Sequence, residues 1–134
     1  SFGDAIQLAG FQALPTNLAP GESIQLTLLW QARRRPALDY TVFVHLLNQQ
    51  EERMAGHDTQ PLGGRYPTTI WSAGEQILDT HQLTLPPDLP AGAYQLAIGL
   101  YHQPTGQRLP LGFGAGGIDL DGRLMLPVTL AVNP

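Results

Sequence analysis

Apolar and polar residues alternate with a period of two over several short stretches of this chain. The clearest stretch is IQLTLLWQA at residues 24–32, where the even-numbered positions are apolar and the odd-numbered positions are polar except Leu29. Such alternation predicts a β-strand with one buried and one solvated face, as in antiparallel sheets. Trp30 shares the apolar face, so we expect it to lie in the core.

Eight stretches predict strands, at residues 5–14, 24–32, 40–48, 54–60, 76–85, 94–102, 108–113 and 123–132. The stretch 40–48, YTVFVHLLN, is apolar on both faces and is predicted to lie centrally in a sheet. Gly10 predicts a bulge in the first strand. Pro110 and Pro127 lack the N–H that a ladder needs, so their strands are predicted at an edge or with bulges. Residues 61–76 are predicted to form a long loop with room for a single helical turn.

Turn residues separate these strands at short intervals. The chain has fifteen glycines and twelve prolines, and no segment predicts a helix longer than a turn. Seven to eight short strands with turn signals this frequent predict an all-β fold. We therefore expect a single antiparallel β-sandwich domain over residues 1–134, either immunoglobulin-like or jelly-roll-like.

Composition excludes several classes of protein. The 134 residues are 43% hydrophobic, enough for one domain with a core, and contain no cysteine for disulfides or thiolate metal sites. The net charge is −4 and only Arg33-Arg34-Arg35 clusters positive charge, so a nucleic-acid partner is not expected. No apolar run approaches the ~20 residues of a transmembrane segment. The abrupt start, SFGDAIQL, predicts a domain excised from a longer protein.

The loop before residue 76 holds the best candidates for a ligand site. Trp71 and Tyr66 could stack on a sugar ring, while Arg65, Asp58 and His57 could bind its hydroxyl groups. This combination is typical of a carbohydrate-binding module. The alternative is structural, because a large apolar residue in a loop commonly plugs an open end of the core. In that case Trp71 is a core residue.

Asp79 and His81 form the second candidate. They share the parity of Ile77 and Leu83, the apolar face of their strand. An Asp oriented toward a His is an acid–base arrangement, so a small hydrolase using Asp79, His81 and His57 is one hypothesis. The favoured alternative is structural: Asp79 accepts backbone N–H groups of the loop while His81 packs as a satisfied ring. A bulge near Leu78 would instead turn both outward.

No metal or cofactor is predicted. The four histidines lack the spacing of a known zinc site, and no G-x-S-x-G elbow is present. The stretch GIDLDGR places Asp119 and Asp121 before Gly122, but it lacks the further oxygen ligands of a calcium loop, so a hairpin turn is favoured. The run 33–35 is predicted to be a solvated loop, with contact to anionic lipid headgroups as an alternative.

One resemblance spans residues 2–132. The succession LAPGESIQLTLLWQA, DYTVFVHLLN and HDTQPLGGRYPTTIWSAGEQILDTHQLTLPPDLPAGAYQLAIGLYHQPTGQRLPL resembles the C-terminal β-sandwich domain of multi-spanning membrane glycosyltransferases of the protein mannosyltransferase-like type in filamentous green bacteria. The resemblance implies a domain tethered on the extracytoplasmic side of the membrane, beside an enzyme that handles lipid-linked sugar. It transfers no catalytic residue, because that chemistry belongs to the membrane portion.

The leading functional prediction is a noncatalytic extracytoplasmic accessory domain, not an enzyme by itself. Its expected partner is a glycan, bound through Trp71, Tyr66, Asp58, Arg65 and His57, or the membrane part of its parent protein. The first alternative is a ligand-free spacer or assembly domain that makes contacts through strand edges. The second alternative is the small hydrolase.

Overall fold

The computed structural model describes residues 1–113, 117–119 and 121–134. Within these ranges the chain forms eleven strands and two 3-10 helices. Their bounds are β1 Ile6–Leu14, β2 Asn17–Leu18, β3 Ser23–Ala32, β4 Thr41–Leu47, β5 Arg53–Thr59, η1 Pro61–Gly64, η2 Thr68–Ile70, β6 Gln76–Thr84, β7 Gly92–His102, β8 Gln107–Arg108, β9 Leu111–Phe113, β10 Gly117–Asp119 and β11 Leu124–Val132. In this part of the chain, no helix has the length and hydrophobicity that crossing a lipid bilayer requires.

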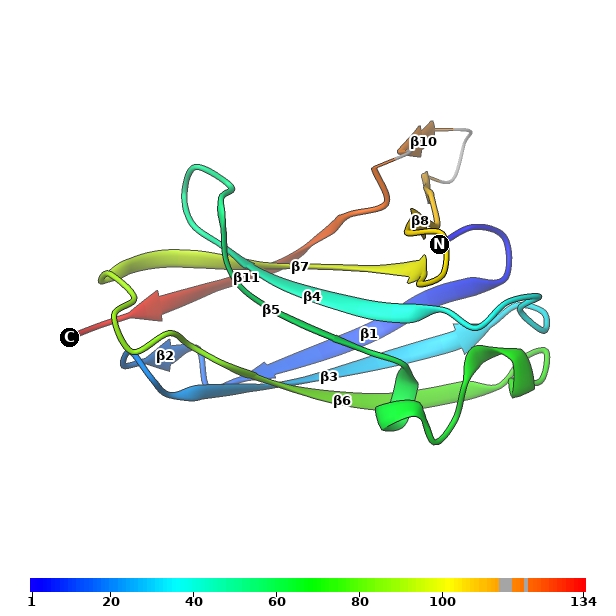
Figure 1. Ribbon diagram of the computed structural model, residues 1–134, viewed down its shortest axis with the longest axis horizontal. Coiled ribbons are helices and arrows are strands. Elements are labelled where there is room, and N and C mark those ends of the chain that lie inside the picture. Colours follow the sequence, from blue (N-terminus) through cyan, green and yellow to red (C-terminus); the bar gives the residue numbers. More distant parts are fainter. Residues whose placement is uncertain (114–116, 120) are drawn as a thin grey trace.

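The strands form the two layers of a β-sandwich (Figure 1). One sheet has the order β1-β3-β6, and the other has the order β2-β11-β7-β4-β5, with β8 paired to β7. Strands β9 and β10 form a separate hairpin. Among the described strands every pairing is antiparallel except the two-residue pairing of β2 with β11. The predicted all-β antiparallel sandwich is confirmed.

The partition of the longer strands resembles the immunoglobulin arrangement. Seven strands have seven residues or more. The first, second and fifth of them form one sheet, and the third, sixth and seventh lie in the other, as in immunoglobulin domains. The fourth, β5, pairs with β4 instead of joining the first sheet.

Most predicted strands coincide with observed ones, and the prolines explain the exceptions. The single strand predicted at 108–113 is divided at Pro110 into β8 and β9. Pro127 lies within a register shift between Met125 and Thr129, and the pairing of β1 shifts between Leu8 and Gly10, so both predicted irregularities are confirmed. Strand β4 is buried throughout and lies between β7 and β5, as its apolar pattern predicted.

The core lies between the two sheets, where the alternating faces of β3 and β6 meet β4 and β7. Trp30 has no exposed surface, which confirms its predicted place in the core, and its ring meets Phe2 edge-on at 5.5 Å between centroids. The predicted loop at 61–76 contains two short helical turns, η1 and η2, whereas the sequence predicts room for one. Both lie beside one end of β6 (Figure 1).

Candidate functional site

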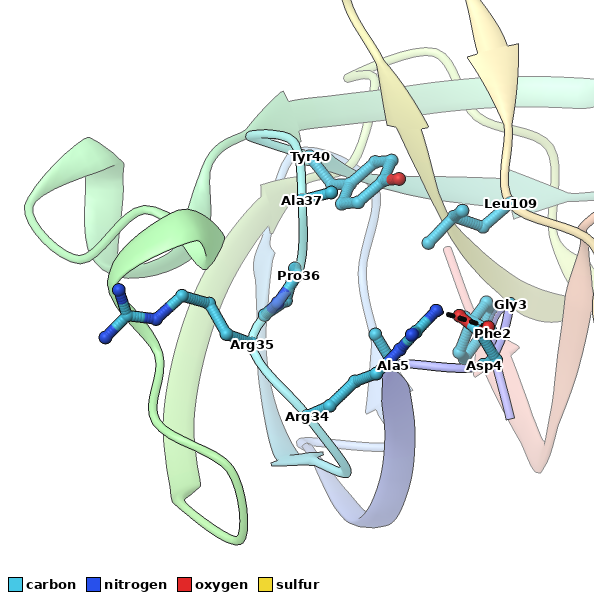
Figure 2. A pocket seen from close by; sticks show the side chains of 10 residues that line it. All are labelled: Phe2, Gly3, Asp4, Ala5, Arg34, Arg35, Pro36, Ala37, Tyr40 and Leu109. Carbon is cyan, nitrogen blue, oxygen red and sulfur yellow. Dashed lines mark hydrogen bonds and ion pairs between the residues drawn. The ribbon is translucent and has the colours of Figure 1, made fainter.

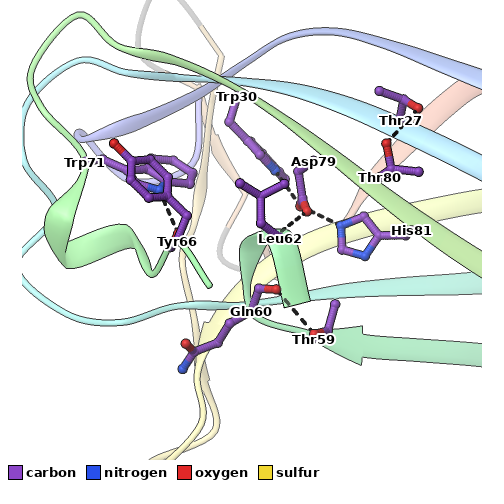
Figure 3. Close-up of polar contacts among 10 residues, drawn as sticks. All are labelled: Thr27, Trp30, Thr59, Gln60, Leu62, Tyr66, Trp71, Asp79, Thr80 and His81. Atoms are coloured by element: carbon purple, nitrogen blue, oxygen red, sulfur yellow. Dashed lines mark hydrogen bonds and ion pairs between the residues drawn. The ribbon is translucent and has the colours of Figure 1, made fainter. Parts of the chain in front are cut away.

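Asp79 is the centre of a buried hydrogen-bond network (Figure 3). Strand β6 alternates exposed and buried residues, which directs Asp79 and His81 into the core. One carboxylate oxygen, Oδ1, accepts the Leu62 backbone N–H at 2.9 Å. The other, Oδ2, accepts the Trp30 indole N–H at 3.2 Å and lies 2.5 Å from His81 Nε2. Three donors therefore serve one carboxylate, as a buried acid requires.

The surroundings of Asp79 keep it ionised. Burial by itself would raise the pKa of this carboxyl, but His81, together with the N–H groups of Leu62 and Trp30, outweighs burial and holds the pKa below its usual value. The favoured structural interpretation of Asp79 is confirmed by the bond from Leu62, a residue of the loop. The same interpretation expected a fully hydrogen-bonded His81 ring, and this part is wrong, because the buried Nδ1 has no hydrogen-bond partner among the described residues.

The hydrolase hypothesis is not supported by this arrangement. The His57 ring lies 5.5 Å from the His81 ring, so the three predicted residues are near one another. However, Asp79 is 0% exposed and His81 is 1% exposed. A substrate has no access to either side chain, and the network therefore stabilises the loop and the core.

Trp71 is a core residue, which corrects its predicted role in stacking on a sugar. Its side chain is 0% exposed, and its indole N–H donates to the Tyr66 carbonyl oxygen at 3.0 Å. The residue follows η2 and closes the end of the sandwich beside Tyr66 (Figure 3). Tyr66 is half-buried, and its hydroxyl donates to Glu75 at 2.5 Å. The loop aromatics thus hold the loop in place and present no open stacking platform.

The other three predicted ligand residues do not converge with these aromatics. Arg65 is exposed, and its Nε donates to the Leu62 carbonyl oxygen at 3.1 Å. His57 and Asp58 are neighbours on β5 and therefore point to opposite faces of the sheet. His57 faces His81 in the core. Asp58 faces outward, where its Oδ2 accepts the Tyr101 hydroxyl at 2.8 Å.

Around Asp58 the larger sheet carries a hollow of about 200 Å³ on its outer face. This outer-face hollow is lined by Phe43, His45, Arg53, Asp58, Tyr101, Gly106 and Arg108. They come from β4, β5, β7, β8 and the turn between the last two. The volume is below the ~300–1,000 Å³ range of pockets for drug-sized ligands.

Aromatic rings form the floor of the outer-face hollow. Phe43 and His45 project from the outer side of β4 with their ring centroids 4.6 Å apart, and Tyr101 lies 6.3 Å from Phe43. The Arg108 guanidinium covers the Phe43 ring at 4.5 Å, a cation–π contact that orients the guanidinium. Gly99 pairs with Phe43 in the neighbouring strand. A Cβ at residue 99 would lie 2.2 Å from the Phe43 ring, so the glycine leaves room for that ring.

The charges in the hollow follow from the same packing. Burial lowers the pKa of His45, and the charge of Arg53 lowers it further, so the imidazole is neutral at pH 7. Burial and the hydrogen bond to Asp58 raise the pKa of Tyr101, which remains a phenol that donates its proton. The hollow thus offers one carboxylate, two guanidinium groups and a neutral imidazole.

Sequence reasoning found only Asp58 among these residues. For Phe43 and His45 the available signal is the stretch 40–48, which is apolar at both parities. Its outer-face residues include Phe43 and His45, which are 2% and 8% exposed although no second layer lies over them. Side chains from β5, β7 and β8 cover them.

The arginine run at 33–35 lies beside another hollow, near the N-terminus (Figure 2). The Arg34 guanidinium pairs with the Asp4 carboxylate, and this bond lowers the pKa of Asp4. Arg35 also lines the hollow, with its guanidinium directed away from Arg34 and Asp4 (Figure 2). The run is an exposed loop, as predicted, and one of its three charges is neutralised within the chain.

Two further candidates concern metal binding. Within residues 1–113, 117–119 and 121–134, no group of three or more His, Asp or Glu side chains is placed to hold a metal ion. The Asp119 side chain lies outside the described residues. At the predicted turn, Gly122 adopts a φ of +65°, and a Cβ there would lie 2.4 Å from the Leu109 carbonyl oxygen, so only glycine fits. The predicted hairpin is absent among the described strands, since β10 pairs with β9.

No protein-family model matches the chain, and no curated protein matches it in sequence. Solved structures do match its fold. The C-terminal domain of Wzt superposes with a TM-score of 0.60 at 14% identity, over 100% of this chain and 77% of that one. The Pseudomonas fluorescens alkylpurine DNA glycosylase AlkC, bound to DNA with an abasic-site analogue, matches with a TM-score of 0.57 at 12% identity, over 98% of this chain and 31% of that one.

The Bacillus subtilis sporulation control protein Spo0M gives a TM-score of 0.50 at 16% identity, over 97% of this chain and 50% of that one. These identities are low, so the similarities concern the fold. The chain has the same β-sandwich architecture as the Wzt C-terminal domain, and its function has to be inferred from its own surface.

Proposed function

We propose that this chain is a noncatalytic carbohydrate-binding accessory domain, with the outer-face hollow as its binding site. The observation that carries the proposal is the Asp58–Tyr101 pair at the rim of a ring-floored hollow. Tyr101 occupies one carboxylate oxygen of Asp58 and orients the group, while Oδ1 has no hydrogen-bond partner among the described residues. That oxygen is available to accept a hydroxyl hydrogen bond from a ligand.

The remaining lining groups suit a sugar ring. Arg53 and Arg108 supply N–H donors in a planar fork for hydroxyl or ring oxygens. Tyr101 is partly exposed and presents an amphipathic ring beside them. A few placed polar groups around apolar surface are the usual composition of a small-ligand site.

The same lining argues for binding without hydrolysis. Glycoside hydrolases generally need two carboxyl groups, roughly 5–9.5 Å apart, on either side of the scissile bond. Asp58 is the one carboxylate among the residues that line the hollow. The buried Asp79 has no access to solvent. A glycan held here would therefore be recognised and not cleaved.

The wider context belongs to the same proposal. The resemblance to C-terminal domains of membrane glycosyltransferases supports a place on the extracytoplasmic side, tethered through the parent chain. In that position, a sugar-binding domain would hold an acceptor or a product glycan near the enzyme. The membrane part of the parent protein is the second proposed partner.

A glycan array tests the proposal, with the wild-type domain beside Asp58→Asn and Asp88→Asn. Asp88 is an exposed carboxylate outside the hollow, so its variant is the matched control. We expect saturable binding that Asp58→Asn weakens about tenfold or more and Asp88→Asn leaves unchanged, because the lost hydrogen bond involves a charged acceptor. Folded wild-type protein that binds no glycan, or binding indifferent to Asp58→Asn, would refute the proposal.

A further inference from the structure

Positive charge gathers at the outer-face hollow although the chain as a whole is negative. Two of its lining residues are arginines, Arg53 and Arg108, and one is a carboxylate, Asp58. Their formal charge is therefore +1, in a chain of net charge −4 with seven arginines and no lysine. Burial is the main cause that lowers the pKa of His45 on the floor of the hollow; the charges of Arg53, Arg108 and Arg123 lower it further, whereas Asp58 raises it.

Of the two arginines that line the hollow, Arg53 forms no ion pair with a described residue. It lies exposed on β5, and no hydrogen bond or ion pair joins its guanidinium to another residue in the part of the chain that the structure describes. Its guanidinium lies across Gly56, where a Cβ would come within 2.2 Å of Nη2. Gly56 is the ladder partner of His45, so this glycine lets Arg53 lie flat along the wall of the hollow.

Arg108 is held differently, yet it faces the same space. It covers the Phe43 ring, and its Nη1 donates to the Asp121 carbonyl oxygen at 3.1 Å. Nη1 also forms an ion pair with the Asp121 carboxylate at 3.6 Å. The guanidinium is thus positioned by a ring, a carbonyl and a carboxylate, and an arginine oriented in advance loses less entropy when it binds a planar anion.

We propose that the outer-face hollow takes an acidic sugar residue, with its carboxylate or phosphate on Arg53 and Arg108 and its hydroxyl groups on Asp58. This inference rests on the proposed function and specifies its ligand class. Carboxylate and phosphate share the geometry that guanidinium forks recognise in a bidentate manner. The arrangement places the acidic group at the arginine wall and keeps it away from the Asp58 carboxylate.

Calorimetric titration of the domain with matched pairs of glycans tests the inference. The acidic members are oligogalacturonate, sialyllactose and a mannose-6-phosphate oligosaccharide. Their neutral counterparts are carboxyl-reduced oligogalacturonate, lactose and the unphosphorylated mannose oligosaccharide. We expect at least one acidic member to bind about tenfold or more tightly than its counterpart, as a charge-assisted pair should. The preference should shrink as NaCl is raised. A preference within a uronate or sialate pair would indicate a carboxylate ligand, and a preference within the mannose pair would indicate a phosphate ligand.

Two variants assign the preference to the hollow. Arg53→Gln should remove most of the preference for the acidic member, whereas Arg33→Gln, at an exposed arginine of the loop between β3 and β4, should retain it. Neutral and acidic members that bind equally, with sensitivity to Asp58→Asn, would overturn the acidic class and leave the carbohydrate-binding function standing. Binding of acetate or phosphate alone as tightly as the acidic glycans, or no binding of any glycan, would overturn both.

Discussion

The Asp79 carboxylate accepts the backbone N–H of Leu62 at 2.9 Å, which ties the segment between β5 and β6 to the middle of β6. Leu62 has a φ of +55°, a left-handed conformation that costs a non-glycine residue energy. The bond to a buried, ionised carboxylate offsets that cost. The conformation of Leu62 in this loop is therefore stabilised by a core residue.

Replacing Asp79 should be strongly destabilising. Asp79→Asn removes the negative charge beside His81. It also replaces a carboxylate that accepts three hydrogen bonds with an amide, whose nitrogen can only donate. Leaving buried donors unpaired typically costs about 1–3 kcal/mol, and more beside charged groups, so we expect urea denaturation to show a loss of unfolding free energy of about 3 kcal/mol. Asp88→Asn is the control and should change the free energy by less than about 0.5 kcal/mol. A small effect of Asp79→Asn would mean that the network contributes little.

Trp71→Ala should lower stability by about 3–5 kcal/mol, the usual cost of removing a large buried aromatic side chain. Its side chain is 0% exposed, so the loss comes from the cavity and from the indole bond to Tyr66. Ile70, the preceding residue, is 49% exposed, and Ile70→Ala should have little effect. Thermal unfolding of the two variants gives the comparison, and equal melting temperatures would contradict the place of Trp71 in the core.

Stability should decrease as the pH falls below about 6.5, the ordinary pKa of histidine. Burial is the main cause that lowers the pKa of both His45 and His57 in the folded state. The unfolded chain therefore binds protons at these positions at a higher pH than the folded chain does, so acidification favours unfolding. Urea denaturation between pH 7 and pH 5 measures the slope. Combined His45→Gln and His57→Gln substitutions should flatten it.

A second loss is expected in more acidic solution. Asp79 has a folded-state pKa below its usual value, so its contribution is complete above about pH 4, the ordinary pKa of an aspartate. That contribution disappears as the pH falls through the lower, folded-state pKa. In Asp79→Asn this acid-dependent part of the stability profile should be absent, and a profile identical to wild type there would contradict the expectation.

Gly99→Ala should destabilise the domain by about 1–3 kcal/mol, the usual cost of overpacking. The new Cβ would lie 2.2 Å from the Phe43 ring and 2.4 Å from the Gly122 carbonyl oxygen. The shift of Phe43 should also weaken ligand binding at the outer-face hollow. Gly10→Ala is the matched control, because no atom lies within 4 Å of a Cβ there. Similar unfolding free energies for the two variants would show that Phe43 moves aside at no cost.

Most of the candidate site could not be predicted from sequence, and Arg53 and Arg108 show why. They are distant in the chain and meet because β4 pairs with β5 on one edge and with β7 on the other, while β8 returns along β7. Asp58 was found through its place in the sequence beside the loop, yet its contact in space is Tyr101. The sequence leaves Trp71 open between a sugar-stacking residue and a core residue, because a loop position says nothing of what covers it; the structure shows it buried.

The sequence by itself determined the longer strands, their buried faces and the two-layer class, because period-two alternation and the positions of glycine and proline are local properties. It also determined that Asp79 and His81 share the apolar face of one strand. Only the tertiary structure decided that Leu62 and Trp30 satisfy that buried carboxylate, that Trp71 closes the core, and that side chains of four strands form one hollow. Those outcomes depend on pairing between strands that are far apart in the chain, and a local sequence pattern carries no information about such pairing.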